Sequence, residues 1–541
     1  MARRHAGGVS LALAAPADQL FVATEVNEWA LCATIAAADP SCTGALEAAL
    51  LAELLEDAAE GAQVLPPVLE EGAALARLAE LASREAHPAL MGLIDAAEAR
   101  ALPHVLDEET LTLGAGSGGR DFCLAALPAP AAVPWDELHD VPTALVTGSN
   151  GKTTTVRLLA ACALAHGWPS AFCCTDGVFF EGSARASGDY SGPEGARRVI
   201  RERGAQAAVI ETARGGILRR GLAISRARVA VVTNVSADHF GEYGIDDLAG
   251  LADVKLTVAG VVTRAGLLVL NADDAQLVAK AQALPQRFGR PPPLGWFALD
   301  ADHPLLRAHR GGGGATCGAR DGRLLLQHGG HEADLGAVRA LPLTIDGSAS
   351  YNIANLAGAA LAAAGLGIPP RVIAEVFARF GANFRDNLGR MMRFERDGVC
   401  ILVDYAHNPD GMRGLLSVAE HLRRPGGRVG TLLGQAGNRR DSEVEALAAV
   451  VAGFHPDLVV VKEDEAHLRG RDPGEVPRLL HAALRRAGLP EAALPLRKSE
   501  LEAVDCALEW ARPGDVLALP VHSPAARAAV LALLSAASGA S

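Results

Sequence analysis

The clearest chemical signal in the sequence is a glycine-containing turn at residues 147–155, TGSNGKTTT. An apolar strand-like segment precedes the turn and an apolar helical segment follows it, so backbone N–H groups and a helix N-terminus can bind phosphate oxygens there. Lys152 would neutralise the β- and γ-phosphates, and the Thr153 hydroxyl would ligate Mg²⁺. The loop is a variant, because the general pattern has glycine where this chain has Val146. We expect ATP or GTP to bind through Gly148, Asn150, Gly151, Lys152, Thr153 and Thr154.

Two further polar residues stand at the ends of strand-like segments downstream of this loop. Glu211 stands near the end of the segment AAVIET, and His239 follows VAVVTNVSAD. The carboxyl ends of parallel strands meet at one edge of a sheet, where such sheets bind ligands, so we expect both residues beside the phosphate loop. Taken singly, a glutamate at a strand end is typical of a solvated loop, and a lone histidine of the surface or the core.

The motifs after the loop distinguish between classes of nucleotide-binding enzyme. TGSNGKTTT resembles the phosphate loop of the Mur ligase family, ATP-dependent enzymes that form amide bonds. The segments ETARGGILRRGL, NLGRMMRF, DYAHNPDG, GNRRD and DEAHLRGRDPGEV are similar to the cyanophycin-synthetase subgroup of that family. The resemblance covers about residues 140–540, apart from an irregular stretch at about 285–345. It implies a carboxylate activated by ATP as an acyl phosphate and then attacked by an amine, with release of ADP and phosphate.

The resemblance also implies roles for individual residues. Glu211 and His239 would join Thr153 around Mg²⁺, and Lys255 matches a lysine that is carbamylated in several family members and could then hold a second Mg²⁺. Asn352 and Asn355, three residues apart on one helix face, would line the nucleotide cleft, although capping of an alanine-rich helix is an equal reading. From the C-terminal region, the expected nucleotide contacts are Arg390, which would reach the ATP phosphates, and Asp404; His407 and Asn408 lie in the loop after Asp404.

Charged residues in the shared segments are candidates for substrate binding. Arg214 and Arg219 could hold substrate carboxylates, while Asp464 and Glu465 could hold a cationic amine. His407 is a further substrate candidate. The alternative for both charged clusters is a solvated surface. We expect a small-molecule or peptide carboxylate and an amino-acid amine as the two substrates.

The elements that position these residues indicate an α/β protein of three domains. Residues 1–137 mix alanine-rich helical patterns with short strands and end in the proline-rich run LPAPAAVPW. Residues 138–384 would form the ATP-binding domain, with the stretch at about 285–345 as a small peripheral sheet. Strand and helix patterns alternate again over residues 385–541, which predicts a Rossmann-like parallel-sheet domain. Because the candidate residues are divided between two domains, domain closure would assemble the site.

The N-terminal region departs from the resembling subgroup. Cyanophycin synthetase carries an ATP-grasp domain ahead of its Mur-like part, and residues 1–137 are too few for one. We therefore expect a docking or remnant domain there, and a single amide ligation carried out alongside a separately encoded ATP-grasp ligase. The competing hypothesis is a nucleotide-binding scaffold or partner subunit without turnover of its own.

Composition sets limits on the remaining possibilities. The 50 basic and 63 acidic residues give a net charge of −13, which argues against a nucleic-acid or anionic-membrane surface. The nine cysteines are dispersed, without a C-x-x-C pair, so we expect reduced thiols and a cytoplasmic protein. The apolar stretch at the start of the chain is too short for a signal sequence. We find no uncharged apolar run of about 18 residues, so we expect no membrane span. The sequence leaves the oligomeric state open.

Overall fold

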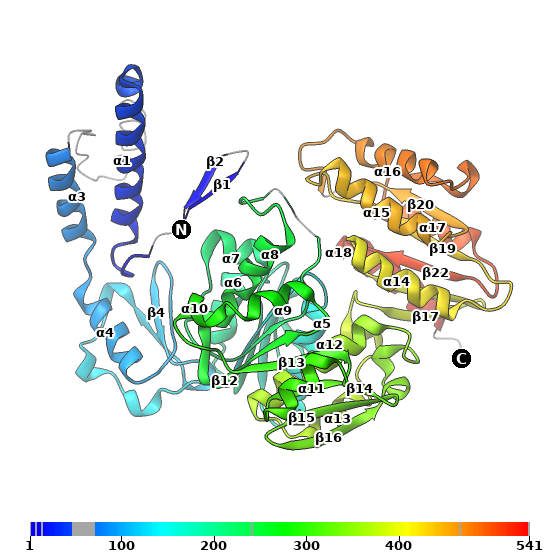
Figure 1. The fold of residues 1–541 in the computed structure, drawn as a ribbon, viewed down its shortest axis with the longest axis horizontal. Helices are drawn as coiled ribbons and strands as arrows, with labels where there is room; N and C mark the ends of the chain where they lie inside the picture. Colours follow the sequence, from blue (N-terminus) through cyan, green and yellow to red (C-terminus); the bar gives the residue numbers. More distant parts are fainter. Residues whose placement is uncertain are drawn as a thin grey trace. The chain divides into compact units, whose positions relative to one another are not determined.

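The chain divides into two compact units, each of which is described by itself. A computed structural model describes residues 2–5, 8–11, 14–45, 71–237, 240, 242–464 and 467–538 (Figure 1). The first unit comprises residues 1–114 and 120–139, and the second comprises residues 115–119 and 140–541.

The first unit combines helices with short antiparallel strands. Its core joins Leu90 and Leu93 from α4 (Pro88–Ala99) to Leu111 and Leu113 from β4 (Thr110–Leu113). The strands of this unit form a pair and a three-stranded sheet: β1 (Ala2–His5), β2 (Gly8–Leu11), β3 (His104–Leu106), β4 and β5 (Arg120–Cys123).

The longest described helix of the first unit is α1 (Leu20–Ala38), which packs beside α3 (Glu71–Glu85). The two carboxylate oxygens of Glu85 accept hydrogen bonds from the Phe21 and Val22 N–H groups at 2.7 and 2.8 Å, respectively. Helix α1 is long and apolar enough to cross a membrane. N-terminal signal sequences and core helices of soluble proteins meet the same criterion of length and composition. The uncharged-run criterion missed α1 because Glu25 and Glu28 interrupt its apolar residues.

The larger sheet of the second unit has eleven strands in the order β16-β15-β14-β13-β12-β11-β6-β10-β7-β8-β9. The strands from β14 to β7 run parallel, and antiparallel hairpins extend both edges. Helices α5 (Lys152–Ala165) and α12 (Ser350–Leu366) pack on this sheet and supply much of its core. The strand bounds are β6 (Thr143–Thr147), β7 (Ser170–Cys174), β8 (Gly177–Phe180), β9 (Ser183–Ser187), β10 (Ala207–Glu211), β11 (Ala227–Val232), β12 (Val262–Asn271), β13 (Leu294–Asp300), β14 (Ala315–Arg320), β15 (Arg323–His328) and β16 (His331–Ala337).

The expected small peripheral sheet at 285–345 is wrong, because this segment extends the larger sheet. Strand β13 pairs in parallel with β12, and β14 to β16 continue from it. Trp296 and Phe297 are buried in β13, which explains why this strand lies inside the sheet although glycines and prolines flank it. The irregular composition belongs to the loops and to α11 (Pro304–Gly311).

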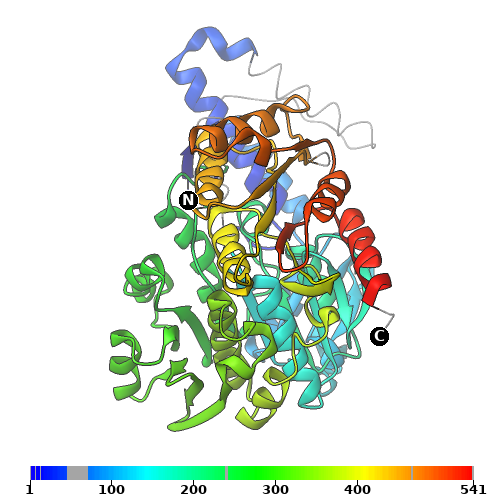
Figure 2. The same cartoon turned by 90° about the vertical axis from the view of Figure 1, so that its right-hand side faces the viewer.

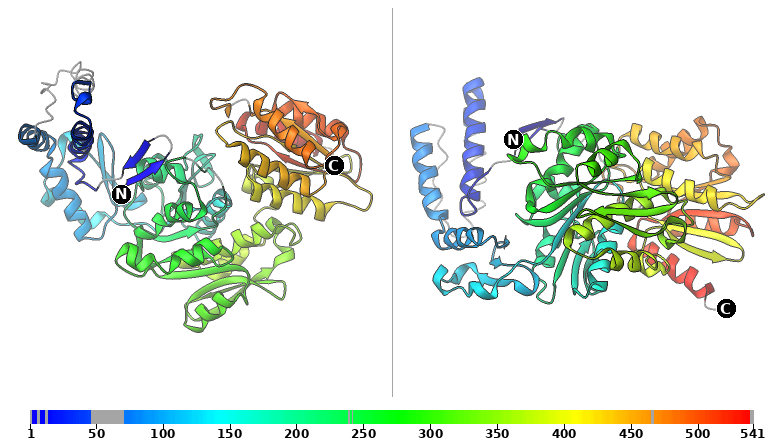
Figure 3. Two further views of the ribbon diagram at one scale, coloured as in Figure 1. Left: turned by 45° about the horizontal axis from the view of Figure 1, so that its top comes forward. Right: turned by 60° about the horizontal axis from the view of Figure 1, so that its bottom comes forward.

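The C-terminal residues form a second sheet of six strands, ordered β17-β18-β22-β19-β20-β21. The left view of Figure 3 shows these residues, yellow to red, as a lobe beside the green sheet of the same unit. Helices α14, α15 and α16 cover one face of the sheet, and α17 and α18 cover the other (Figure 2). The elements are β17 (Met392–Arg396), β18 (Val399–Asp404), α14 (Pro409–Leu422), β19 (Val429–Leu433), α15 (Asp441–Gly453), β20 (Leu458–Lys462), α16 (Glu475–Arg486), β21 (Leu496–Arg497), α17 (Glu500–Trp510), β22 (Val516–Pro520) and α18 (Pro524–Ser538). The predicted α/β fold with parallel sheets is confirmed.

Candidate active site

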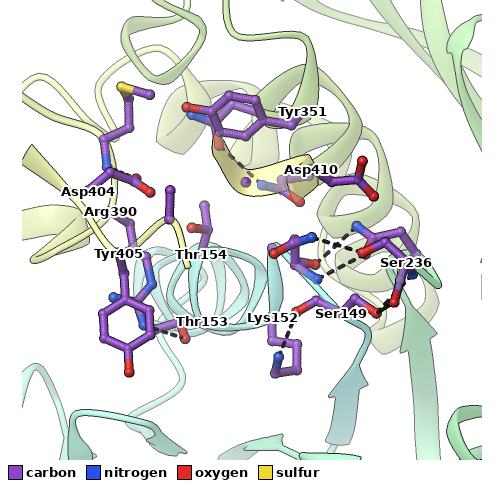
Figure 4. Close-up of a pocket in the computed structure, with 18 of the residues that line it drawn as sticks. Ser149, Lys152, Thr153, Thr154, Ser236, Tyr351, Arg390, Asp404, Tyr405 and Asp410 are labelled. Atoms are coloured by element: carbon purple, nitrogen blue, oxygen red, sulfur yellow. Dashed lines mark hydrogen bonds between the residues drawn. The ribbon is translucent and has the colours of Figure 1, made fainter. Parts of the chain in front are cut away.

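A cavity of about 370 Å³ lies where the carboxyl ends of β6, β10 and β11 meet the start of the C-terminal sheet. The middle sheet contributes the phosphate loop and Glu211 to its walls. Arg390 and Asp404 come from the C-terminal side (Figure 4), and His407 lines the cavity from the loop after Asp404. The structure therefore brings together most of the residues that the sequence predicted for nucleotide binding.

The phosphate loop depends on two glycines with backbone conformations that other residues rarely adopt. Gly148 has φ of +150° and Gly151, which precedes α5, has φ of +82°. An added Cβ would lie 1.8 Å from the Thr233 hydroxyl at Gly148, and 2.1 Å from an Asn355 side-chain oxygen at Gly151. Substitution of either glycine would therefore distort the loop.

The end of β11 holds the loop in place through hydrogen bonds. The Asn150 N–H donates to the Asn234 side-chain oxygen at 2.9 Å, and the Thr233 hydroxyl donates to the Asn150 carbonyl at 2.6 Å. The Lys152 ammonium donates to the Ser149 carbonyl at 3.1 Å, within the loop itself. The N-terminus of α5 and the Lys152 charge thus line a single rigid turn, which suits a polyphosphate.

Hydroxyl and carboxylate oxygens that could ligate a metal meet at the base of the cavity. The Thr153 hydroxyl donates to one carboxylate oxygen of Glu211 at 2.9 Å, and the Thr175 hydroxyl donates to the other at 3.0 Å. Glu211 is fully buried, and Arg390 lies 3.4 Å from the Thr153 hydroxyl. A carboxylate and a hydroxyl beside a phosphate-binding loop are the oxygen donors that Mg²⁺ prefers.

The other two metal candidates are placed differently. His239 lies outside the described residues, so its predicted role stays a prediction. Lys255 is buried at the end of α8 (Leu248–Lys255) but does not line the cavity. Burial raises the pKa of Asp274, which does line the cavity, while backbone hydrogen bonds and the charge of Lys255 oppose that rise. Among the described residues, no group of three or more histidine, cysteine or acidic side chains is arranged to hold a metal.

The two asparagines of α12 face the phosphate loop. Both are buried, the Asn352 amide donates to the Leu343 carbonyl at 2.9 Å, and the Asn355 amide donates to the Asn352 side-chain oxygen at 3.1 Å. The residue that caps α12 is Ala349, so the capping role considered for the asparagines is wrong. Both asparagines line the cavity, and their contact with a nucleotide stays a prediction.

The C-terminal sheet presents Arg390 to the phosphate side of the cavity. Its guanidinium carbon lies 4.4 Å from the centre of the Tyr405 ring, and Figure 4 shows both residues next to Thr153. Asp404 accepts a hydrogen bond from the Met391 N–H at 2.6 Å. Burial raises the pKa of Asp404, and the neighbouring Arg390 charge opposes that rise. A side chain stacked on an aromatic ring is held in one direction, which suits a contact to phosphate.

Asn408, which the sequence left without a role, links the two sheets. Its side-chain amide donates to the Asn150 side-chain oxygen at 2.9 Å, and its own oxygen accepts from the Gly411 N–H at 2.9 Å. Asn408 thus caps α14 and touches the phosphate loop with the same side chain.

Of the candidate substrate residues that the structure describes, all but His407 lie outside this cavity. Arg214, at the start of α7 (Arg214–Arg220), forms an ion pair with Glu242, whereas Arg219 is exposed. The Asp464 carboxylate accepts from His467 at 2.9 Å, and Glu465 lies outside the described residues. Only His407 among these candidates lines the cavity with the nucleotide residues.

The segment GNRRD reaches the loop that carries the partner of Arg214. The Asn438 amide donates to Glu242 at 2.9 Å, and Arg440 pairs with Asp246 at 2.8 Å. The C-terminal sheet and the middle sheet therefore meet around Arg214 as well as around the nucleotide cavity.

Sequence reasoning missed a buried ionic cluster below the C-terminal side of the site. Lys462 is fully buried at the end of β20 and is paired with Glu500. The Glu500 carboxylate also accepts from the N–H groups of His522 and Ser523, each at 2.8 Å. His522 in turn contacts the Ala406 carbonyl at 3.0 Å, next to His407. The sequence signal that could have pointed to this cluster is Lys462, which directly follows the apolar run LVVV.

Comparisons with known proteins agree with this arrangement. Residues 146–288 match the Mur ligase middle domain, and residues 389–519 match the Mur ligase glutamate ligase domain. Cyanophycin synthetase from Synechocystis sp. is 34% identical over 369 residues, which are 68% of this chain and 41% of that protein. The chain thus spans less than half the length of that relative.

Two other comparisons cover most of the compared protein. The UDP-N-acetylmuramoyl-L-alanyl-D-glutamate--2,6-diaminopimelate ligase of Xanthomonas campestris is 31% identical over 73% of this chain and 78% of that ligase. E. coli FolC, solved in complex with ADP, has the same fold, with a TM-score of 0.52 at 17% identity over 73% of this chain and 89% of that chain. With its middle and C-terminal domains matched, the chain belongs to the Mur ligase family.

Proposed function

We propose that this protein is an ATP-dependent ligase that joins a carboxylate to an amino-acid amine. One observation carries the proposal: Lys152, Thr153 and Glu211 of the middle sheet share a cavity with Arg390 and Asp404 of the C-terminal sheet. A phosphate loop alone would serve any nucleotide-binding protein, whereas cations from two sheets suit a phosphoryl group in transfer. The proposed domains are residues 1–137, 138–384 and 385–541.

In the proposed reaction, a carboxylate oxygen of the first substrate attacks the γ-phosphorus of ATP. ADP leaves, and the product is an acyl phosphate. The amine of the second substrate then attacks the acyl carbon, phosphate leaves, and the nitrogen loses a proton as the amide forms. Lys152 and the N–H groups at the start of α5 bind the phosphates, and Arg390 stabilises the charge on the transferred group.

Mg²⁺ bound with ATP would neutralise the charge between the β- and γ-phosphates. Thr153 and Glu211 fit this ion, because their oxygens are 2.9 Å apart at the base of the phosphate loop. We propose His239 as a third member of this site and a carbamylated Lys255 as an oxygen donor near Asp274. Both assignments rest on family resemblance.

The amine substrate would bind where the GNRRD segment meets the loop of Glu242. Arg214 is buried there, and Asp464 with its partner His467 follows the end of β20. These charges suit a substrate that carries both a carboxylate and a cation, as amino acids do. The similarity to cyanophycin synthetase supports such a substrate class. We place the reaction in the cytoplasm.

A phosphate-release screen with ATP, Mg²⁺ and pools of amino acids and short peptides tests this proposal. We expect release that requires both a carboxylate and an amine, with an amide product detected by mass spectrometry. Lys152→Ala should lower the release about 10³-fold, and the exposed Lys498→Ala should not change it. Nucleotide binding without stimulation by any acceptor pair would instead support the scaffold, or a subunit of a separate ATP-grasp ligase.

A further inference from the structure

A second hollow, of about 620 Å³, lies on the middle domain and is lined by four arginines. Arg226 and Arg228 stand at the start of β11, Arg264 lies near the start of β12, and Arg290 precedes β13. The remaining lining residues are Asp140, Thr263 and Ala265. In a chain with net charge −13, four positive side chains around one hollow form a marked local reversal of charge.

An irregularity in the sheet shapes this hollow. Strands β11 and β12 pair at Ala227 with Val262 and next at Val229 with Leu267, so β12 bulges over residues 263–266. Gly266 permits the close approach, because an added Cβ would lie 2.3 Å from the Arg228 carbonyl oxygen. The bulge therefore presents Thr263, Arg264 and Ala265 to the hollow instead of continuing the ladder.

None of the four guanidinium groups forms an ion pair with a carboxylate among the residues that the structure describes. Arg228 donates to the Gly365 carbonyl at 3.1 Å and Arg290 donates to the Val262 carbonyl, so backbone contacts hold both side chains. The Nε atom of Arg226 is buried without a hydrogen-bond partner. Across the described part of the chain, no ion pair involves any of the four. The hollow holds one carboxylate, that of Asp140, against four arginines, so the guanidinium groups still repel one another, and a bound anion reduces this repulsion.

This hollow is separate from the nucleotide site. Strand β11 runs parallel to β6, whose carboxyl end leads into the phosphate loop, whereas the arginines lie at the amino end of β11. The carboxyl end of β11 leads to Thr233 and Asn234, which hold the phosphate loop. The two sites therefore occupy opposite ends of the same strands.

We propose that this arginine hollow binds a compact multivalent anion, one bearing several phosphate or carboxylate groups, in addition to the nucleotide in the catalytic cavity. Planar guanidinium groups that converge on one space match the paired oxygens of such groups. Arg226 and Arg264 are the main ligands, because no protein hydrogen bond or ion pair occupies either guanidinium in the described structure.

The test is calorimetric titration of the full chain with inorganic tripolyphosphate and, separately, with citrate. A saturating non-hydrolysable ATP analogue and Mg²⁺ keep the phosphate loop occupied throughout. We expect binding with a stoichiometry near one, and at least tenfold weaker binding to Arg226→Gln/Arg264→Gln. The exposed Arg371→Gln, on the same domain, should bind as the wild type does. Tighter binding of tripolyphosphate would identify a phosphate-bearing ligand, and tighter binding of citrate a polycarboxylate.

A second variant guards against loss of folding. Arg264→Glu places an opposite charge at an exposed position and should weaken the better probe by more than Arg264→Gln does. Equal thermal unfolding temperatures would show that both variants are folded. Failure of both probes to bind the wild type would overturn the proposal, as would equal affinity of the wild type and the folded variants.

Discussion

The carboxyl edges of the two sheets in the second unit are built in different ways. The middle sheet offers a continuous turn whose backbone groups and hydroxyls are fixed by neighbouring strand ends. The C-terminal sheet instead relies on side chains far apart in sequence, with Lys462, Glu500 and His522 buried together. Phosphate is recognised largely by backbone groups, so its site can be local, whereas the positions of loops from several strands must be fixed by long-range contacts.

The largest effect on turnover is expected at the carboxyl edge of the middle sheet. Lys152→Ala removes the cation of the phosphate loop and should lower turnover about 10³-fold, because charge stabilisation of the transferred phosphoryl group is lost. The protein should stay folded, since the Lys152 side chain makes a single hydrogen bond to its own loop. Phosphate release, compared with that of Lys498→Ala, measures the effect. Turnover within about twofold of the wild type would show that this loop is not catalytic.

On the C-terminal edge, the large effect should fall on stability. Lys462→Met leaves the Glu500 carboxylate buried without its cation, and loss of one partner of a buried pair costs about 3 to 5 kcal/mol in free energy of unfolding. Urea denaturation measures this loss. Lys462→Met/Glu500→Gln should recover part of it, because no unpaired charge then remains. If the single variant is as stable as the wild type, the ionic cluster does not hold this edge together.

A smaller effect is expected where the two edges touch. Asn408→Ala removes both the helix cap and the bond to Asn150, whereas Asn408→Ser keeps a capping oxygen but is too short to reach Asn150. Both variants should raise the KM for ATP about tenfold, a loss near that of one hydrogen bond. Only the alanine variant should also be less stable. Unchanged ATP kinetics in both variants would separate Asn408 from nucleotide binding.

The smallest effect is a pH dependence of stability. Burial lowers the pKa of His522 well below its usual range, and the charge of Lys462 adds to the lowering, with His407 and His467 also contributing. Below pH 6.5 the unfolded chain therefore binds a proton that the folded chain does not, so stability falls as the pH falls. From pH 7 to pH 6 the expected loss is about 0.7 kcal/mol.

Denaturation of the wild type and of His522→Asn at both pH values measures this contribution. The variant should lose about 0.7 kcal/mol less than the wild type over that interval, because its side chain does not titrate. The same pH dependence in both proteins would show that His522 titrates alike in the folded and unfolded states.

The same contrast explains how much the sequence could predict. The phosphate loop and Glu211 were identifiable because each follows a recognisable apolar strand, and the order of strands and helices indicated the α/β fold. Asn408 was visible but had no assignable partner, since its contact with Asn150 spans 258 positions. The cluster of Lys462 with Glu500 and His522 could not be inferred, because a single lysine at a strand end does not indicate its partner. The stretch 285–345 was wrongly predicted to be a separate small sheet, because its loops, and not its strands, dominate its composition.

The central claim is that ATP activates a carboxylate as an acyl phosphate before the amine attacks. Its most direct test uses the substrate pair found by the phosphate-release screen, with both carboxylate oxygens of the first substrate replaced by ¹⁸O. If the acyl phosphate forms, the amide keeps one labelled oxygen and the released phosphate carries the other, as mass spectrometry of the phosphate would show. Phosphate without label, released at the same rate, would mean that water attacks ATP and would contradict the account.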